Sequence, residues 1–337
     1  MGRFYLCSLT SDLITMTNGS SRIAFLFPGQ GSQSVGMGKE LADNYPVARQ
    51  TFEEADEALG YKLSQVCFEG PEEKLKLTEI TQPAILTASV AAWRVLQEKG
   101  VKADYVAGHS LGEYSAHVAA GTLTFADAVR TVRNRGKYMQ EAVPVGVGAM
   151  AAILGMPFDK VAEIASEIVN DAAQGEVCQV ANINSPEQIV ISGHAGAVDR
   201  AIKLATERGA KKAVSLPVSA PFHCSLMQPA QDRLATDLST LNFQNPSCPV
   251  ICNVDAAVVA SAEASRKALI RQVTGAVRWE PSMRLLIEKA ASLFIEVGPG
   301  KVLWGLMRQI DRSKTCLTVG DEASLQKTLA QIEALAA

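Results

Sequence analysis

The sequence predicts an α/β protein with two unequal domains, and three observations support this fold class. The 337 residues are 47% hydrophobic but only 6% aromatic, a composition that suits helices layered on a sheet. Short apolar runs alternate with helical patterns at both ends of the chain. In the middle the order of these elements changes, so a second, smaller core is expected there.

The two ends of the chain show the strand, turn and helix order of a parallel sheet. Strands are expected at 23–27, 104–108, 249–253, 292–297 and 315–319. Helices are expected at 38–59, 83–100, 110–121, 124–140, 226–241, 262–272 and from Asp321 onward. The second of these helices is expected to begin at Pro83, because proline suits the first turn of a helix.

The middle of the chain follows the order strand, helix, strand, strand, helix, strand. The expected ranges are 149–155, 159–173, 177–183, 188–193, 195–208 and 212–218. This order is the ferredoxin-like split βαβ unit, which we interpret as an inserted small domain. The small domain is expected to span 147–219, and the large domain is then discontinuous, with parts 22–146 and 220–337.

Composition and charge exclude several classes of function. Lys and Arg number 32 and Asp and Glu 35, so the formal net charge is −3 and no basic field attracts nucleic acid or an anionic membrane. No apolar run reaches the roughly 18 residues of a membrane helix. The seven cysteines are scattered without a CxxC pair, which argues against a disulfide framework and a zinc site. We expect no metal, no cofactor and a cytoplasmic protein with reduced thiols.

Residues 1–21 are expected to be a disordered N-terminal extension. They include Asp12 and many polar residues, and they lack the long apolar stretch of a signal peptide. Met16 is an alternative start site within this segment.

The motif Gly108-His109-Ser110-Leu111-Gly112 matches G-x-S-x-G between an expected strand and an expected helix. In this motif, glycines allow a sharp turn that exposes the serine hydroxyl at the end of a sheet. The following helix N-terminus and the Leu111 amide are placed to stabilise an oxyanion. The motif is short, so an ordinary turn serine remains the alternative.

A serine nucleophile needs a base, and only four histidines are available. His109 adjoins the serine on a tight turn, His117 lies two helical turns beyond it, and His194 ends a strand of the small domain. His223 lies where the chain re-enters the large domain, at a cleft between domains. Elimination therefore favours His223, with a buried histidine at a domain junction as the alternative.

Three further positions stay open on the residues alone. The group that orients the histidine is one of Asp232, Asp237 and Asp255, or a backbone carbonyl. The glycine-rich loop at 29–33 lacks the features of a phosphate loop and fits better as the second amide of an oxyanion hole. Arg135 is one of four basic residues on its helix, so a solvent-exposed face is the simpler interpretation.

Seven motifs occur together in this chain. They are FPGQGSQ at 27–33, QPAIL at 82–86, GHSLGEYSA at 108–116, RNRGKYM at 133–139, PFH at 221–223, RQVTGAVRW at 271–279 and EVGPGKVL at 296–303. From about Ile23 to the C-terminus, this set resembles the malonyl-CoA:acyl carrier protein transacylases. The resemblance implies an α/β-hydrolase-like large domain with a ferredoxin-like insert.

The resemblance implies a role for each matching residue of the reaction centre. Ser110 would be the acylated nucleophile and His223 its general base and acid. The amides of Gln30 and Leu111 would form the oxyanion hole. Arg135 would hold the malonyl carboxylate in a bidentate pair, which suits its planar guanidinium.

Three more residues match positions that support the substrate or the base. The backbone carbonyl of Gln272 would orient His223, in place of a carboxylate. Gln82 would be a positioning residue of the pocket. Phe222 matches the residue typical of malonyl-selective members, where methylmalonyl-selective members carry a small polar residue.

The implied reaction moves malonyl from malonyl-CoA to the phosphopantetheine thiol of acyl carrier protein, through malonyl-serine, for fatty acid chain elongation. The carrier protein is acidic in systems that this family serves, so Lys137, Lys211, Lys212 and Arg278 are candidate contacts. Two alternatives from other classes are a serine esterase or thioesterase of related fold and a non-catalytic subunit that binds the carrier protein.

Overall fold

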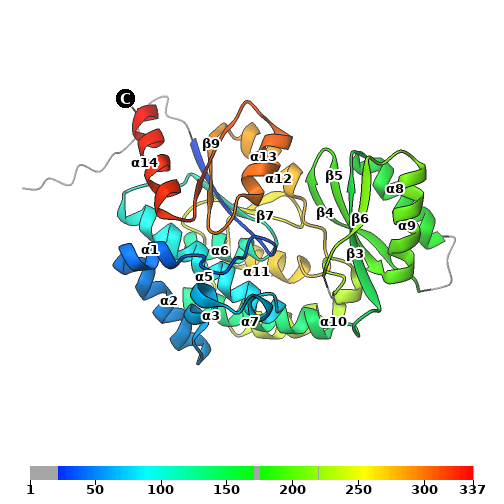
Figure 1. Ribbon diagram of the computed structural model, residues 1–337, viewed down its shortest axis with the longest axis horizontal. Coiled ribbons are helices and arrows are strands. Elements are labelled where there is room, and N and C mark those ends of the chain that lie inside the picture. The colour runs from blue at the N-terminus through cyan, green and yellow to red at the C-terminus, as the bar shows by residue number, and fades with distance from the viewer. Residues whose placement is uncertain (1–21, 171–174, 219, 337) are drawn as a thin grey trace, which may run out of the picture.

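Two β-sheets organise the protein, and helices cover them. A computed structural model describes residues 22–170, 175–218 and 220–336 (Figure 1). The expected extension at 1–21 lies outside the described residues, as do 171–173 of an expected helix.

The larger sheet has six strands in the order β10-β9-β1-β2-β7-β8. All neighbouring pairs are parallel except β7 and β8. The strands are β1 (Arg22–Phe27), β2 (Tyr105–Gly108), β7 (Val250–Cys252), β8 (Ala257–Val259), β9 (Ala291–Val297) and β10 (Thr315–Val319). Strand β1 is an unbroken apolar run after Arg22, as expected for a parallel strand that is covered on both faces.

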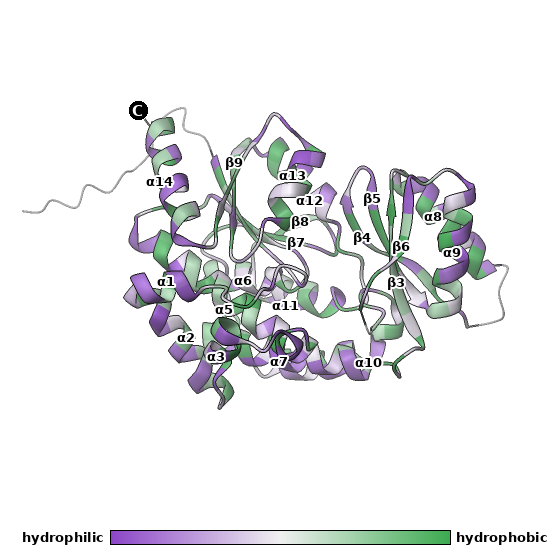
Figure 2. Cartoon of the chain, in the orientation of Figure 1, coloured by the Kyte–Doolittle hydropathy of each residue, from purple (hydrophilic) through white to green (hydrophobic). Residues whose placement is uncertain are grey.

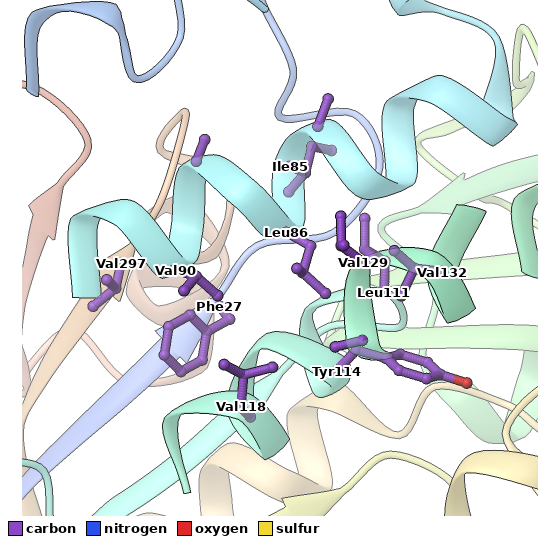
Figure 3. Packing of buried hydrophobic residues seen from close by; sticks show 14 of the residues in the cluster. Phe27, Ile85, Leu86, Val90, Leu111, Tyr114, Val118, Val129, Val132 and Val297 are labelled. Atoms are coloured by element: carbon purple, nitrogen blue, oxygen red, sulfur yellow. The ribbon is translucent and has the colours of Figure 1, made fainter. Parts of the chain in front are cut away.

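Alternate residues of β1 enter two different cores. Phe25 and Phe27 belong to the core that includes α2, α5, α6 and α7. Ala24 and Leu26 belong to the core on the opposite face, with α12 and α13. This alternation follows from the two-residue period of a strand. Figure 3 shows Phe27 with Leu86, Val90 and Val118 in the first of these cores.

The helices of this large domain fall before and after the small sheet in the chain. The first group is α1 (Lys39–Asn44), α2 (Pro46–Leu59), α3 (Leu63–Glu69), α4 (Glu72–Leu75), α5 (Thr78–Glu98), α6 (Gly112–Ala119) and α7 (Phe125–Glu141). The second group is α10 (Gln228–Ser239), α11 (Ala262–Arg271), α12 (Trp279–Glu288), α13 (Val302–Ile310) and α14 (Glu322–Ala336).

The smaller sheet is antiparallel, with four strands in the order β4-β5-β3-β6. Its elements are β3 (Gly148–Leu154), α8 (Phe158–Asn170), β4 (Cys178–Ser185), β5 (Gln188–His194), α9 (Ala195–Glu207) and β6 (Lys212–Ser215). Helices α8 and α9 carry both hydrophilic and hydrophobic residues (Figure 2), and their apolar side chains form a third core with the sheet. The predicted fold class, a parallel α/β domain with a ferredoxin-like unit, is confirmed. The domain boundaries stay a prediction.

The predicted bounds of two helices were wrong, and both errors involve a proline. The helix expected to begin at Pro83 begins at Thr78, with Pro83 in its interior. The amides of Ile80 and Thr81 donate to Leu77 O, so a turn of helix forms ahead of the proline. Conversely, the helix expected at 38–59 is interrupted at Tyr45, which is extended because the next residue is Pro46.

Five short elements, α3, α4, β8, α12 and α13, were not expected from the sequence. Helix α13 shows why. Its first amides, those of Leu303 and Trp304, donate to the carboxylate of Glu296 at 3.0 and 2.8 Å. The cap comes from the adjacent strand β9 and not from the residue before the helix, so local capping rules give no signal.

Candidate active site

The turn between β2 and α6 presents Ser110 in a strained conformation. Its φ is 52°, in the left-handed region that non-glycine residues rarely adopt. The turn is tight because its glycines allow close approach: a Cβ on Gly108 would lie 1.9 Å from the Gly112 carbonyl carbon, and one on Gly112 would lie 2.0 Å from Phe27 O. This is the expected elbow of a serine nucleophile.

His223 contacts the serine hydroxyl. The Ser110 Oγ lies 2.7 Å from His223 Nε2. On the other side of the ring, Nδ1 lies 2.9 Å from Gln272 O and 3.2 Å from Gly275 O. Two carbonyl acceptors require the proton on Nδ1, which leaves Nε2 free to accept the serine proton.

The environment keeps His223 neutral. The residue is 4% exposed. Burial, and then the charge of Arg135, lower the pKa of His223 to about 3. A neutral imidazole is the form that a general base needs.

The three candidate aspartates bind elsewhere. Asp232 accepts from Gln228, Asp237 accepts from Asn134 and Tyr138, and Asp255 pairs with Arg271. Backbone carbonyls therefore hold the histidine, and the choice that the residues alone left open is decided by tertiary structure.

Arg135 is buried beside the serine, so the simpler interpretation of a solvent-exposed face was wrong. The residue is 1% exposed. Its Nη1 donates to Gln82 Oε1 at 2.9 Å, and its Nη2 donates to Ser110 Oγ at 3.0 Å and to Gln272 Oε1 at 2.9 Å. Burial lowers the pKa of Arg135, but a guanidinium stays charged in proteins. All three acceptors are neutral, and among the described residues no carboxylate forms an ion pair with this cation.

Gln82 and Phe222 also lie at this centre. Gln82 is 2% exposed, and its Nε2 lies 3.9 Å from the Met139 sulfur. Phe222 is 9% exposed and directly precedes His223.

The two amides expected to form an oxyanion hole come from neighbouring loops. Gln30 follows β1 and Leu111 follows β2, and the ends of these strands pair at Phe27 and Gly108. In the described part of the chain, neither amide donates to a protein acceptor. Each therefore keeps an N–H that no described protein group accepts.

The remaining histidines do not contact Ser110 Oγ. His109 Nε2 lies 2.8 Å from Asn184 Oδ1, which ties the elbow to the small domain. His117 is buried below the elbow, 3.9 Å from Glu113, and His194 accepts from the Val177 amide.

The four basic residues expected to contact a carrier protein are exposed: Lys137, Lys211, Lys212 and Arg278. Two of them form surface ion pairs, Lys137 with Glu141 at 3.9 Å and Lys211 with Glu187 at 2.9 Å. Their role stays a prediction.

Two residues at the elbow were missed from the sequence, Asn253 and Glu113. Both are fully buried. Asn253 follows strand β7, and a polar residue at the end of a buried strand is a usable signal, since β7 is adjacent to β2. Glu113 lies in the first turn of α6, where an acidic residue is common, so the sequence gives no signal for its burial.

Comparison with known proteins places these residues in a family. The model of the acyl transferase domain matches residues 24–331. A malonyl CoA-acyl carrier protein transacylase of Salmonella typhimurium is 49% identical over 312 residues, covering 92% of this chain and 100% of that protein. The chain belongs to the malonyl CoA-acyl carrier protein transacylase family. The Bacillus subtilis member is also 49% identical, over 91% of this chain and 96% of that one.

Solved structures of this transacylase family have the same fold. The Coxiella burnetii enzyme superimposes with a TM-score of 0.90 at 45% identity, covering 94% of this chain and 99% of that one. A malonyl-transacylase in complex with its type II polyketide synthase acyl carrier protein gives 0.89 at 47% identity, covering 92% and 100%.

Two further features of the described residues bear on other kinds of site. None of their helices is both long and apolar enough to span a bilayer. They also contain no cluster of three His, Cys, Asp or Glu side chains arranged to hold a metal ion.

Proposed function

We propose that this protein transfers malonyl from malonyl-CoA to the phosphopantetheine thiol of an acyl carrier protein through malonyl-Ser110. One observation carries the proposal. The Ser110 hydroxyl lies 2.7 Å from a neutral imidazole and 3.0 Å from a buried guanidinium. The first contact supports acyl transfer, and the second supports an acyl group with a carboxylate.

The first half-reaction loads the serine. His223 Nε2 takes the Ser110 proton as Oγ attacks the thioester carbonyl, and the resulting oxyanion is stabilised by the amides of Gln30 and Leu111. The intermediate then collapses: the C–S bond breaks, and His223 protonates the departing CoA thiolate. The products are malonyl-Ser110 and free CoA.

The second half-reaction reverses these steps with a different thiol. His223 takes the proton of the phosphopantetheine thiol, whose sulfur attacks the malonyl ester. When the C–O bond breaks, His223 returns the proton to Ser110. The carbonyls of Gln272 and Gly275 hold the ring in one tautomer through both halves.

Arg135 would bind the malonyl carboxylate. In the free protein its guanidinium bonds to Gln82, Gln272 and Ser110, all neutral acceptors. A carboxylate is a stronger acceptor and matches the guanidinium with two parallel bonds. Phe222, next to His223, would limit substituents on the acyl group. A simple esterase has no need for such a cation.

The setting of the reaction is part of the proposal. We place it in the cytoplasm and in fatty acid synthesis. The six cysteines in the described residues are free, which fits a reducing compartment. Lys137, Lys211, Lys212 and Arg278 remain candidate contacts for the carrier protein.

Radiolabelled malonyl-CoA, with and without carrier protein, tests the proposal. We expect stable labelled protein that passes its label to the carrier protein, and no label on Ser110→Ala. Rapid release of free malonate would instead indicate an esterase. Absence of label in the unaltered protein would indicate a non-catalytic binding subunit.

A further inference from the structure

The buried side chains of Asn253 and Gln272 make three hydrogen bonds to the backbone of the elbow. Asn253 Oδ1 accepts from the Ser110 amide at 2.6 Å, and Asn253 Nδ2 donates to Gly108 O at 2.7 Å. Gln272 Nε2 donates to Ser110 O at 2.9 Å. The side-chain carboxamide of Asn253 therefore bridges Gly108 and Ser110. Side chains bind both the N–H and the C=O of Ser110.

Glu113 joins these two side chains. Its Oε2 accepts from the backbone N–H of Asn253 at 2.9 Å and from Gln272 Nε2 at 2.7 Å. Glu113, Asn253 and Gln272 are all fully buried. Both bonds end on one carboxyl oxygen, so Glu113 fixes how both partners face the elbow.

The elbow needs such support. Ser110 has a φ of 52°. A residue with a Cβ adopts such a backbone angle only when its surroundings impose it. The bond from Asn253 also occupies the Ser110 amide, so that amide is not free to bind an oxyanion. The Leu111 amide is then the donor that this turn leaves for a ligand.

We propose that Asn253 and Glu113 are positioning residues of the acyl transfer, which hold Ser110 Oγ in line with His223. Neither touches the reacting atoms. This inference rests on Ser110 as the acylated residue. Because the Asn253 side chain bonds to the elbow and not to Arg135, its loss should slow the transfer of all acyl groups equally.

The first test substitutes Asn253 in the full chain. The rate of acyl-serine formation is measured in single turnover with malonyl-CoA and with acetyl-CoA. We expect Asn253→Leu to lower both rates by about 10²-fold, with their ratio unchanged within about threefold, since a misplaced nucleophile costs that much. A change in the ratio, or a loss explained by the folded fraction alone, would overturn the proposal.

The substitution Asn253→Asp adds a second readout, the pH dependence of activity, which would not change if Asn253 only stabilised the fold. The ionised carboxylate that this substitution introduces accepts from the Ser110 amide but repels Gly108 O. Once protonated, it both accepts and donates, as asparagine does. We therefore expect the activity of the variant relative to the unaltered protein to rise at least tenfold from about pH 8 to about pH 5.5, the range in which a buried carboxyl titrates. A flat ratio would contradict the proposal.

Charged and titratable groups surround this site on every element packed against it. They are His109 on the elbow, Glu113, Tyr114 and His117 on α6, Arg135 on α7, His223, Cys252, Asp255 and Arg278 near Asn253, and Arg271 on α11. All of them are present in both proteins of the pH comparison. Glu113 lies close enough to couple with the new carboxyl, so the ratio reports the titration of this pair, and Glu113→Gln with and without Asn253→Asp isolates the introduced group.

A matched pair at Glu113 tests the other half of the proposal. Glu113→Gln keeps an acceptor oxygen for Asn253 and Gln272, whereas Glu113→Leu removes it. We expect the leucine variant to lose about tenfold more activity than the glutamine variant with acetyl-CoA, which does not need Arg135. With malonyl-CoA the loss should be at least as large, because Gln272 also bonds to Arg135. Equal activity of the two variants would overturn the role of Glu113. Retained labelling in Ser110→Ala would instead overturn the proposed function itself.

Discussion

The candidate site has two parts that the fold supports in different ways. On the proposed function, Ser110 and His223 form the transfer part, and Arg135 and Gln82 form the carboxylate part. Main-chain carbonyls of Gln272 and Gly275 hold the histidine. Side-chain amides of Gln82 and Gln272 hold the arginine. We therefore expect the proposed base to stay fixed through the reaction and the arginine to exchange its neutral partners for a carboxylate.

Burial has opposite consequences in these two parts. It lowers the pKa of both His223 and Arg135. For the histidine this removes the charge and leaves a working base. The arginine keeps its charge, because its ordinary pKa is far above neutral, and the cost of burying that charge favours an anionic ligand. The same physical effect thus prepares one residue for proton transfer and the other for recognition.

The largest expected effect comes from removing the nucleophile of the transfer part. Ser110→Ala should abolish the malonyl-enzyme, because no other hydroxyl in the described site contacts His223. Mass spectrometry of the intact protein after exposure to malonyl-CoA measures the adduct. A malonyl adduct that persists in the variant would show that another residue is acylated.

Arg135→Ala should damage the carboxylate part and spare the transfer part. Two charge-assisted bonds to the malonyl carboxylate are lost, each worth about 1.5–3 kcal/mol. We expect kcat/KM for malonyl-CoA to fall by on the order of 10²-fold or more, with that for acetyl-CoA equal or higher. Equal losses for both substrates would mean that the two parts are not separable.

Arg135→Lys is the matched control for charge without planar geometry. An ammonium cannot bind both carboxylate oxygens in one plane, so this variant should recover only part of the malonyl activity. The same pair of kcat/KM values measures it. Full recovery would show that charge alone, and not the guanidinium shape, selects the acyl group.

Glu113→Gln should change how stability depends on pH. Burial raises the pKa of Glu113 from 4.5 to about 7. A raised pKa means that the stability from the protonated group is present below about pH 4.5 and is lost as the pH rises through about 7. Relative to Glu113→Gln, the unaltered protein should therefore lose roughly 2–3 kcal/mol of unfolding free energy between these limits.

Denaturant unfolding of both proteins across that pH range measures the difference. Glu296 has a raised pKa of about 7 in both proteins, so its contribution cancels. Parallel stability curves would show that the buried carboxyl keeps its ordinary pKa.

The smallest effect is expected at the three aspartates that do not contact His223. Asp232→Asn, Asp237→Asn and Asp255→Asn should each leave kcat for malonyl transfer within about twofold, because backbone carbonyls orient the ring. A true triad aspartate costs about 10⁴-fold when it becomes asparagine. Steady-state kinetics would reveal any such loss, and with it a missed carboxylate.

Local signals predicted the parts of this protein that depend on local chemistry. The glycines of the elbow, the apolar run of β1 and the order of elements in the small sheet all follow from neighbouring residues. The start of α5 could not be predicted in this way, because Pro83 reads as a helix start, while the amides of Ile80 and Thr81 bond to Leu77.

The sequence by itself predicted the fold class, Ser110 as the proposed nucleophile and, by elimination, the histidine that contacts it. Only the tertiary structure decided that Arg135 is buried, that carbonyls and not an aspartate orient His223, and that Asn253 and Glu113 support the elbow. The physical reason is distance along the chain. Asn253 lies 143 residues from Ser110, and Gln272 lies 137 from Arg135. Hydrogen bonds of that range exist only after the parallel sheet has brought the ends of β2 and β7 together.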